Sequence, residues 1–229
     1  MGRVIKYLIT REDHLGGNVI GGDPGTFEPH VWKWLVERYR PRDVLDLGCG
    51  EGHAASYFRS LGCNAIGMDG VKRNAVQLTV PVVVWDLTAG PFLISNIDMI
   101  WCCEVVEHIK DQYVENVVKS LSCGRYIAMT HATTNDGYYH VNPQPSEYWI
   151  SKMSDAGFDY LIDDTEESRR YGQGLFWKNT GLIFRRRSIY ETDSGKCGVL
   201  SSSGEDKSLP ADVPPEWDGP GYLWYGKEV

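Results

Sequence analysis

The sequence lacks any long apolar run. No stretch approaches the roughly 20 consecutive apolar residues that a membrane-spanning helix needs, and the first residues carry neither the apolar stretch nor the small-residue cleavage site of a signal peptide. We therefore expect a cytoplasmic protein with no membrane association.

Cysteine pairs are also missing. The chain holds 6 cysteines but no C-x-x-C pair, and most of the cysteines lie in apolar, strand-like runs. This pattern is typical of small buried side chains in a reducing compartment, and it argues against a cysteine zinc site. The chain is also too long and too apolar for a small disulfide-stapled scaffold.

The sequence also lacks a surplus of positive charge. The net charge is −8, and the segment 191–229 alone contributes eight acids against three lysines, so the first 190 residues are nearly neutral. Such a body lacks the positive surplus that phosphate contacts usually bring. A local basic patch remains at Arg185, Arg186 and Arg187, and it is either a solvated strand end or a nucleic-acid contact.

What is present is the composition of an ordinary globular domain, with 229 residues, 42% hydrophobic and 24% charged. Apolar spacings typical of helices alternate with short β-branched runs typical of strands. This alternation predicts an α/β domain with a mainly parallel sheet covered on both faces. The expected helices are 27–39, 53–61, 114–121 and 149–156, and the expected strands are 44–47, 64–69, 80–85, 97–103, 126–129, 158–162 and 181–184, with a polar loop between the last two strands.

A glycine turn, Gly48-x-Gly50-x-Gly52, directly follows the first predicted strand. Residues without a side chain let the backbone approach a ligand closely. The spacing departs from the G-x-G-x-x-G pattern of nicotinamide-binding proteins. Asp46 and Glu51 place negative charge beside the turn, which would repel a diphosphate and suit a cation.

Acidic residues also end the next strands along the chain. Asp69 lies at the end of the second predicted strand, where a carboxylate can accept both hydroxyl groups of an adenosine ribose. Asp86 ends the third strand, and its carboxylate can accept a hydrogen bond from the amino group of adenine. The backbone of Leu87 can contact the edge of the adenine ring. Glu104 ends the fourth strand. Because ligands bind beyond the carboxyl ends of parallel strands, we expect Asp69, Asp86 and Glu104 to line one crevice.

These motifs, taken in order at 44–52, 67–69, 85–87 and 103–109, resemble those of class I S-adenosylmethionine-dependent methyltransferases. The resemblance covers about residues 27–187. It implies a Rossmann-like three-layer sandwich whose seven-stranded, mostly parallel sheet has an antiparallel last strand. It also implies S-adenosylmethionine as cofactor, with Asp46, Gly48, Cys49, Gly50, Glu51, Asp69, Gly70, Asp86, Leu87 and Glu104 as the candidate cofactor-binding residues.

The same resemblance divides the chain into an N-terminal segment 1–26, a methyltransferase domain 27–187 and an acidic, aromatic-containing tail 188–229. The glycine-rich part of the first segment is either a mobile lid over the cofactor or a surface turn. The aromatic residues of the tail are expected to dock on the body or on a neighbouring subunit, and the oligomeric state stays open.

Methyl transfer from a sulfonium is an in-line displacement, and an alcohol acceptor must also lose a proton to a base or a metal ion. If the chain turns helically at Glu104-x-x-Glu107-His108, these side chains come to one side and could hold a divalent metal with His140 or His131 as fourth ligand. The set resembles ubiquinone-pathway O-methyltransferases and enzymes that 2′-O-methylate small RNAs.

Relatives without a metal suggest the alternative in which Glu104 contacts the methionine amino group while Glu107 and His108 only shape the pocket. The candidate catalytic residues are His108, His140 and Glu107, followed by Tyr138 and His131.

Segments 15–27 and 130–144 are expected to contact the acceptor. The favoured function is O-methylation of a small hydroxylated molecule, sugar-like or a biosynthetic intermediate. An RNA ribose or another macromolecular acceptor, and a non-catalytic cofactor-binding module, are the alternatives.

Overall fold

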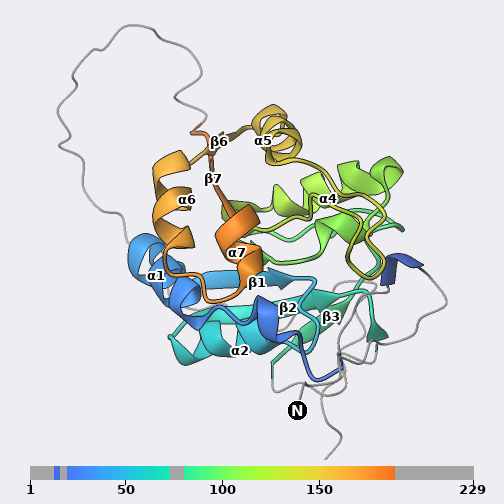
Figure 1. Ribbon diagram of the computed structural model, residues 1–229. Helices are drawn as coiled ribbons and strands as arrows, with labels where there is room; N and C mark the ends of the chain where they lie inside the picture. The colour runs from blue at the N-terminus through green and yellow to red at the C-terminus, as the bar shows by residue number, and fades with distance from the viewer. Residues whose placement is uncertain (1–12, 16–19, 73–79, 189–229) are drawn as a thin grey trace, which may run out of the picture.

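The computed structural model describes residues 13–15, 20–72 and 80–188 (Figure 1). The predicted tail beyond residue 188, and residues 16–19 of the glycine-rich segment, lie outside the described residues. Within the described ranges, no helix combines the length and the apolar character that crossing a bilayer would require.

A single seven-stranded sheet forms the centre of the described chain, with the strand order β3-β2-β1-β4-β5-β7-β6. The first five strands are parallel, and β7 runs antiparallel to both of its neighbours. The predicted fold class is therefore confirmed. The strands are β1 (Asp43–Leu47), β2 (Asn64–Asp69), β3 (Val82–Val84), β4 (Ile97–Cys102), β5 (Gly124–Met129), β6 (Phe158–Tyr160) and β7 (Leu182–Arg186).

Helices cover both faces of this sheet because successive strand residues point to opposite sides. Leu45 and Leu47 pack into the core beneath α4 and α5, whereas Val44 packs with α1, α2 and α7. The result is the predicted three-layer sandwich (Figure 1). The helices are α1 (Pro29–Tyr39), α2 (His53–Ser60), α4 (Val114–Leu121), α5 (Ser146–Asp155), α6 (Ile162–Arg169) and α7 (Leu175–Thr180), and short 3-10 turns are η1 (Asp13–Leu15), η2 (Pro24–Thr26), η3 (Val106–His108) and η4 (Asp111–Tyr113).

The prediction of a polar loop between the last two strands was wrong, because this segment contains α6 and α7. Helix α6 buries Thr165 and Ser168 in place of large apolar residues, so its sequence shows no apolar periodicity. The Thr165 hydroxyl oxygen accepts a hydrogen bond from the Ile183 backbone N–H at 3.0 Å, which fixes the helix to β7. Helix α7 has only 6 residues, too few to display a helical spacing.

The glycine turn after β1 forms as its sequence predicts. Gly48, Gly50 and Gly52 all have positive φ angles, of 74°, 52° and 71°. This left-handed backbone strongly favours glycine. At Gly48 space is also short, since a Cβ atom there would lie 2.2 Å from the side chain of Val105. The turn can therefore press against the segment that follows β4.

Glu28, immediately before α1, anchors the N-terminal segment. Its side chain is fully buried, and its carboxylate oxygens accept hydrogen bonds from the backbone N–H groups of Gln173 at 2.6 Å and Gly174 at 2.8 Å. Charge-assisted hydrogen bonds of this kind are about twice as strong as neutral ones. They tie the segment that precedes α1 to the turn that precedes α7.

We predict that Glu28→Ala lowers the free energy of unfolding by roughly 1–3 kcal/mol, because it leaves the partly buried N–H groups of Gln173 and Gly174 without their acceptor. Urea denaturation measures the change. Glu37→Ala is the matched control, since Glu37 is exposed on α1 and its one ion pair among the described residues is with Lys33, at 3.7 Å. Equal losses in the two variants would show that Glu28 does not anchor the segment.

Candidate active site

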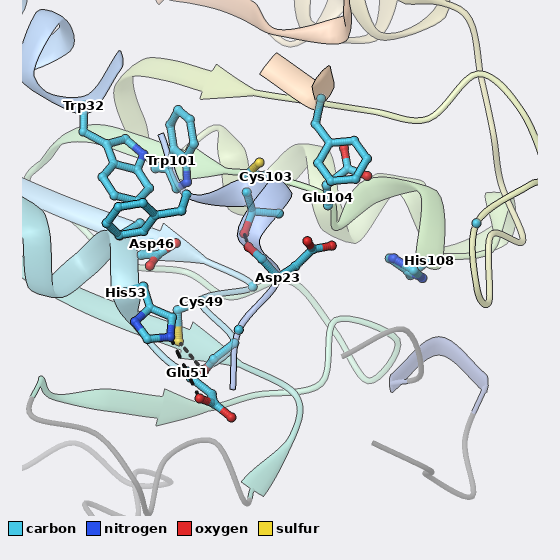
Figure 2. Close-up of a pocket in the computed structure, with 18 of the residues that line it drawn as sticks. Asp23, Trp32, Asp46, Cys49, Glu51, His53, Trp101, Cys103, Glu104 and His108 are labelled. Atoms are coloured by element: carbon cyan, nitrogen blue, oxygen red, sulfur yellow. Dashed lines mark hydrogen bonds and ion pairs between the residues drawn. The ribbon is translucent and has the colours of Figure 1, made fainter. Parts of the chain in front are cut away.

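Two adjacent cavities open beyond the carboxyl ends of β1, β2 and β4, with volumes of about 210 and 110 Å³. They share Gly48, Glu104 and His108 and so form one continuous site, whose larger part is shown in Figure 2. The predicted shared crevice for the strand-end acids is present. All ten candidate cofactor-binding residues line it: Asp46, Gly48, Cys49, Gly50, Glu51 and Glu104 line the larger cavity, and Asp69, Gly70, Asp86 and Leu87 line the smaller one.

In the smaller cavity, Asp69 holds the glycine turn to the end of β2. Its two carboxylate oxygens accept hydrogen bonds from the backbone N–H groups of Gly50 at 2.8 Å and Val71 at 2.7 Å. Met68 and Trp85 line the same cavity, where their side chains are placed to cover a flat ring. Binding of a nucleoside in this cavity stays a prediction.

Asp86 lies at the far end of this smaller cavity. One of its oxygens accepts hydrogen bonds from the Thr88 N–H and hydroxyl, both at 2.8 Å, and the other lies 3.0 Å from Nε2 of His14. Burial raises the pKa of Asp86, but these hydrogen bonds outweigh burial and hold the pKa below its usual value. Asp86 is therefore an ionised acceptor.

His14 was not predicted to contact this site, whereas Leu15 begins the segment 15–27 that was expected to contact the acceptor. Both belong to η1, and a Cβ atom placed on Gly70 would lie 2.4 Å from the Leu15 side chain. No motif in the sequence marks these residues, because only the folded chain brings η1 beside the end of β3. The N-terminal segment thus walls the smaller cavity through η1 and the larger one through residues 22–27.

In the larger cavity, Asp46 is the most buried acid of the candidate cofactor site, with 3% of its surface exposed. One carboxylate oxygen accepts a hydrogen bond from the Ala55 N–H at 3.0 Å, in the first turn of α2. Burial raises the pKa of Asp46 to about 7, and the nearby charge of Asp69 adds to the increase. A cation bound here would favour the ionised form and lower that pKa again.

Glu104 has a positive φ of 57°, which is uncommon for a residue other than glycine. The fully buried Thr130, just after β5, fixes this conformation: its hydroxyl oxygen accepts a hydrogen bond from the Glu104 N–H at 2.8 Å and donates one to the Glu104 carboxylate at 2.9 Å. Sequence analysis did not single out Thr130. Its position beside Glu104 follows from the pairing of β4 with β5.

Glu107, His108 and His140 form a cluster in which one potential ligand atom from each residue lies within 4.8 Å of the others. The 3-10 turn η3 carries the first two residues, as the predicted helical turn requires. Nδ1 of His108 lies 3.0 Å from the Tyr139 carbonyl oxygen, and Nδ1 of His140 lies 3.2 Å from the Thr134 carbonyl oxygen. Both carbonyls can only accept, so each Nδ1 carries the proton and each Nε2 keeps its lone pair.

The carboxyl group of Glu107 is fully buried, and neither of its oxygens has a hydrogen-bond partner among the described residues. Burial raises its pKa well above the usual value, and repulsion from Glu104 acts in the same direction. Burial also lowers the pKa of His108 to about 4, so this imidazole is neutral at pH 7. The backbone oxygen of Glu107 accepts hydrogen bonds from the N–H groups of Val141 and Asn142, which hold the His140 loop in place.

His131, the alternative fourth metal ligand, is not brought into this cluster. Its Nε2 atom lies 2.9 Å from the Ser146 hydroxyl at the start of α5. Of the predicted ligands, Glu107, His108 and His140 are together. Glu104 lies beside Glu107 and is held by Thr130.

Residues 27–140 match the protein family described as Methyltransferase domain. A probable S-adenosylmethionine-dependent methyltransferase of Mycolicibacterium smegmatis is 28% identical over 102 residues, covering 39% of this chain and 40% of the relative. A ubiquinone biosynthesis O-methyltransferase of Rickettsia typhi is 30% identical over 89 residues, covering 34% of this chain and 36% of the relative. Both alignments thus span about two fifths or less of the curated relatives.

Among solved structures, magnesium protoporphyrin IX methyltransferase from Synechocystis PCC 6803, with S-adenosylhomocysteine bound, shares the fold. Its TM-score is 0.53 at 17% identity, over 69% of this chain and 80% of that one. The chain belongs to the class I S-adenosylmethionine-dependent methyltransferases. S-adenosylmethionine is accordingly the cofactor of this methyltransferase domain, while the contacts expected from individual residues stay predictions.

We predict that Asp46→Asn stabilises the cofactor-free methyltransferase at pH 8. The carboxyl group binds its proton more tightly in the folded state, with a pKa of about 7, than in the unfolded state, with an ordinary value of 3.8. Its ionisation therefore destabilises the fold as pH rises through about 7. One pKa unit corresponds to about 1.4 kcal/mol, so the difference between about 7 and 3.8 allows a gain of at most roughly 4 kcal/mol at pH 8.

The gain should shrink as pH falls from 8 to 5, and urea denaturation at several pH values measures it. The asparagine oxygen can still accept the hydrogen bond from Ala55, so the packing is preserved. Asp163→Asn, at an exposed position on α6, is the matched control. A gain that does not change with pH would contradict the raised pKa of Asp46.

Proposed function

We propose that this methyltransferase transfers a methyl group to a hydroxyl oxygen of a small hydroxylated acceptor. The observation that carries the proposal is the position of His108 and His140, which line the same cavity as Glu104 and the glycine turn. A proton acceptor and the proposed cofactor site therefore line the same cavity. The O-methyltransferase named above among the curated relatives supports the same chemistry.

S-adenosylmethionine supplies an electrophilic methyl group on a positively charged sulfur. The protein has to hold the acceptor oxygen in line with that group and keep water out. In our proposal, Asp69 and Asp86 bind the adenosine part and the glycine turn leaves room for the methionine part. Asp46 and Glu104 provide the negative charge that a sulfonium and an ammonium group need in a buried site.

The acceptor hydroxyl must lose its proton during transfer. His108, with a pKa of about 4, is a weak base at neutral pH and is better suited to offering an uncharged lone pair. His140 is only partly buried and lines the cavity. We assign proton acceptance to His140. The hydrogen bond to the Thr134 carbonyl sets the His140 tautomer that leaves Nε2 available.

The residues of the cluster fit a divalent metal ion. The buried oxygens of Glu107 lack hydrogen-bond partners among the described residues, and both imidazoles donate through Nδ1 to backbone carbonyls, an arrangement common for metal-bound histidine. Glu107, His108 and His140 would hold the ion, with Glu104 beside them. His140 has one free lone pair, on Nε2, so it acts as the base in the metal-free site and as a ligand when the ion is bound. A mixed oxygen and nitrogen set suits magnesium, manganese, iron or zinc. The ion would lower the pKa of an acceptor hydroxyl.

The arginine patch gives no support for an RNA acceptor. Arg186 on β7 lies opposite Phe158, and its side chain donates to the Gly124 carbonyl at the amino end of β5, at the sheet edge opposite the cavities. Arg187 donates to Asp159 at 2.9 Å, and Arg185 lies 3.7 Å from the same carboxylate. These contacts favour the interpretation of the patch as a strand end.

We predict that 4-methylcatechol, a small vicinal diol, accepts labelled methyl groups from S-adenosylmethionine. His140→Ala should reduce turnover on the order of 100-fold or more by removing the base, while calorimetry shows unchanged binding of S-adenosylmethionine. Glu107→Gln should weaken binding of Mn²⁺ measured by equilibrium dialysis. His30→Ala, at an exposed position on α1, is the matched control and should keep full turnover.

Methylation of amines or carbon acids but of no hydroxyl would overturn the proposed reaction. Full activity of His140→Ala would remove His140 from the mechanism. Equal Mn²⁺ binding by wild type and Glu107→Gln would argue against a metal in this cluster.

A further inference from the structure

The larger cavity is unusual in its charge. Among the described residues that line it there is no lysine or arginine, but there are four carboxylates, those of Asp23, Asp46, Glu51 and Glu104. The smaller cavity also lacks both basic residue types among its described lining residues. An acceptor with a negative charge would find no lysine or arginine partner among the described residues of these walls.

Three of the four carboxylates already have a role. Asp46 and Glu104 flank the glycine turn and serve the positive groups of the cofactor in the proposed function. Glu51 accepts a hydrogen bond from the Gly21 N–H at 2.8 Å and lies 3.9 Å from Nε2 of His53. The fourth carboxylate, that of Asp23, has no such role and belongs to no cofactor motif.

Asp23 is held rigidly at the start of η2. One carboxylate oxygen accepts a hydrogen bond from the Gly25 N–H at 2.8 Å, and the Asp23 carbonyl oxygen accepts hydrogen bonds from the N–H and hydroxyl of Thr26. No described residue forms an ion pair with Asp23. Figure 2 shows its carboxylate reaching into the pocket on the side of Glu104 and His108.

Aromatic side chains surround the same space. Phe27 and Tyr138 line the cavity with 45% and 43% of their surfaces exposed, and Phe176 lines it next to Gly25. Trp32 and Trp101 line its inner wall (Figure 2). Exposed aromatic rings at a pocket favour a flat ligand, and their faces attract cations.

We infer that the acceptor is a hydroxylated aromatic amine carrying a positive charge, and that the carboxylate of Asp23 binds its ammonium group. This inference rests on the proposed function and names its substrate class. Asp23 acts as a specificity-determining residue, because its charge selects amines and rejects carboxylates of the same shape.

Three probes test the inference by differing mainly in charge: 3,4-dihydroxyphenethylamine, 4-methylcatechol and 3,4-dihydroxyphenylacetate. Binding is measured by calorimetry with the full chain saturated with S-adenosylhomocysteine, and methylation of each probe is measured in parallel. We expect the amine to bind about tenfold more tightly than the carboxylate, or better, which corresponds to about 1.4 kcal/mol.

Asp23→Asn should bring the amine and carboxylate affinities close together. The asparagine oxygen can still accept the hydrogen bond from Gly25, so the η2 turn is kept. Asp163→Asn, which removes the same charge from the exposed surface of α6, should leave the preference for the amine unchanged.

Equal binding of the amine and the carboxylate, an unchanged preference in Asp23→Asn, or binding of none of the probes would overturn the inference. Different outcomes would refute the proposed function. A preference for the amine that depends on Asp23, without methylation of any hydroxyl, would refute O-methylation and leave the charge selection standing. Methylation of 4-methylcatechol, with equal binding of the amine and the carboxylate, would support O-methylation and refute the charge selection by Asp23.

Discussion

The burial of carboxylate groups at one edge of the sheet is the constraint on which the site depends. Asp46 is almost inaccessible to water, and its charged form is unfavourable there until a cation is bound. The surrounding structure reduces this cost without removing it. The first turn of α2 supplies one N–H to Asp46, and the left-handed turn at the three glycines keeps the backbone clear of the space that the cofactor needs. In the proposed function, a positively charged cofactor supplies the missing charge.

The residues that line the proposed cofactor site could be predicted from the sequence, because most of them lie at or just after the end of a strand whose apolar pattern is visible. Asp69 and Asp86 end predicted strands, and parallel strands bring their carboxyl ends to the same edge. Thr130 and His14 could not be predicted in the same way. The contact of Thr130 with Glu104 depends on which strand pairs with which, and His14 reaches Asp86 across 72 positions of the chain.

The other differences between the sequence-based predictions and the structure have a similar physical origin. Helix α6 packs through buried hydroxyl groups, so the apolar spacing used to find helices is absent from it. The metal cluster was visible as a pattern, but its ligand set depended on backbone geometry. Tyr139 adopts a positive φ of 61° and its carbonyl oxygen contacts His108, and nothing in the sequence specifies that conformation. His131 was the alternative to His140 as the fourth ligand, and it lies beside Ser146 instead.

In the proposed function, cofactor binding and acceptor choice use different parts of the chain. The strand ends and the glycine turn would form the cofactor walls, whereas the N-terminal segment around Asp23 and the loop ending at His140 would form the acceptor walls of the same cavity. Loops on a rigid scaffold can vary without disturbing it, which explains how one fold serves many acceptors. Glu28 and the backbone of Glu107 fix these two segments to the scaffold.

The central claim, that the site is built negative for a positively charged cofactor, is tested most directly by proton exchange on binding. Calorimetric titrations near pH 7, in buffers of different ionisation enthalpy, count the protons released. S-adenosylmethionine should release more protons than S-adenosylhomocysteine, which lacks the positive sulfur, because only the sulfonium drives Asp46 to ionise fully. Equal proton release for the two ligands, or none for either, would contradict the claim.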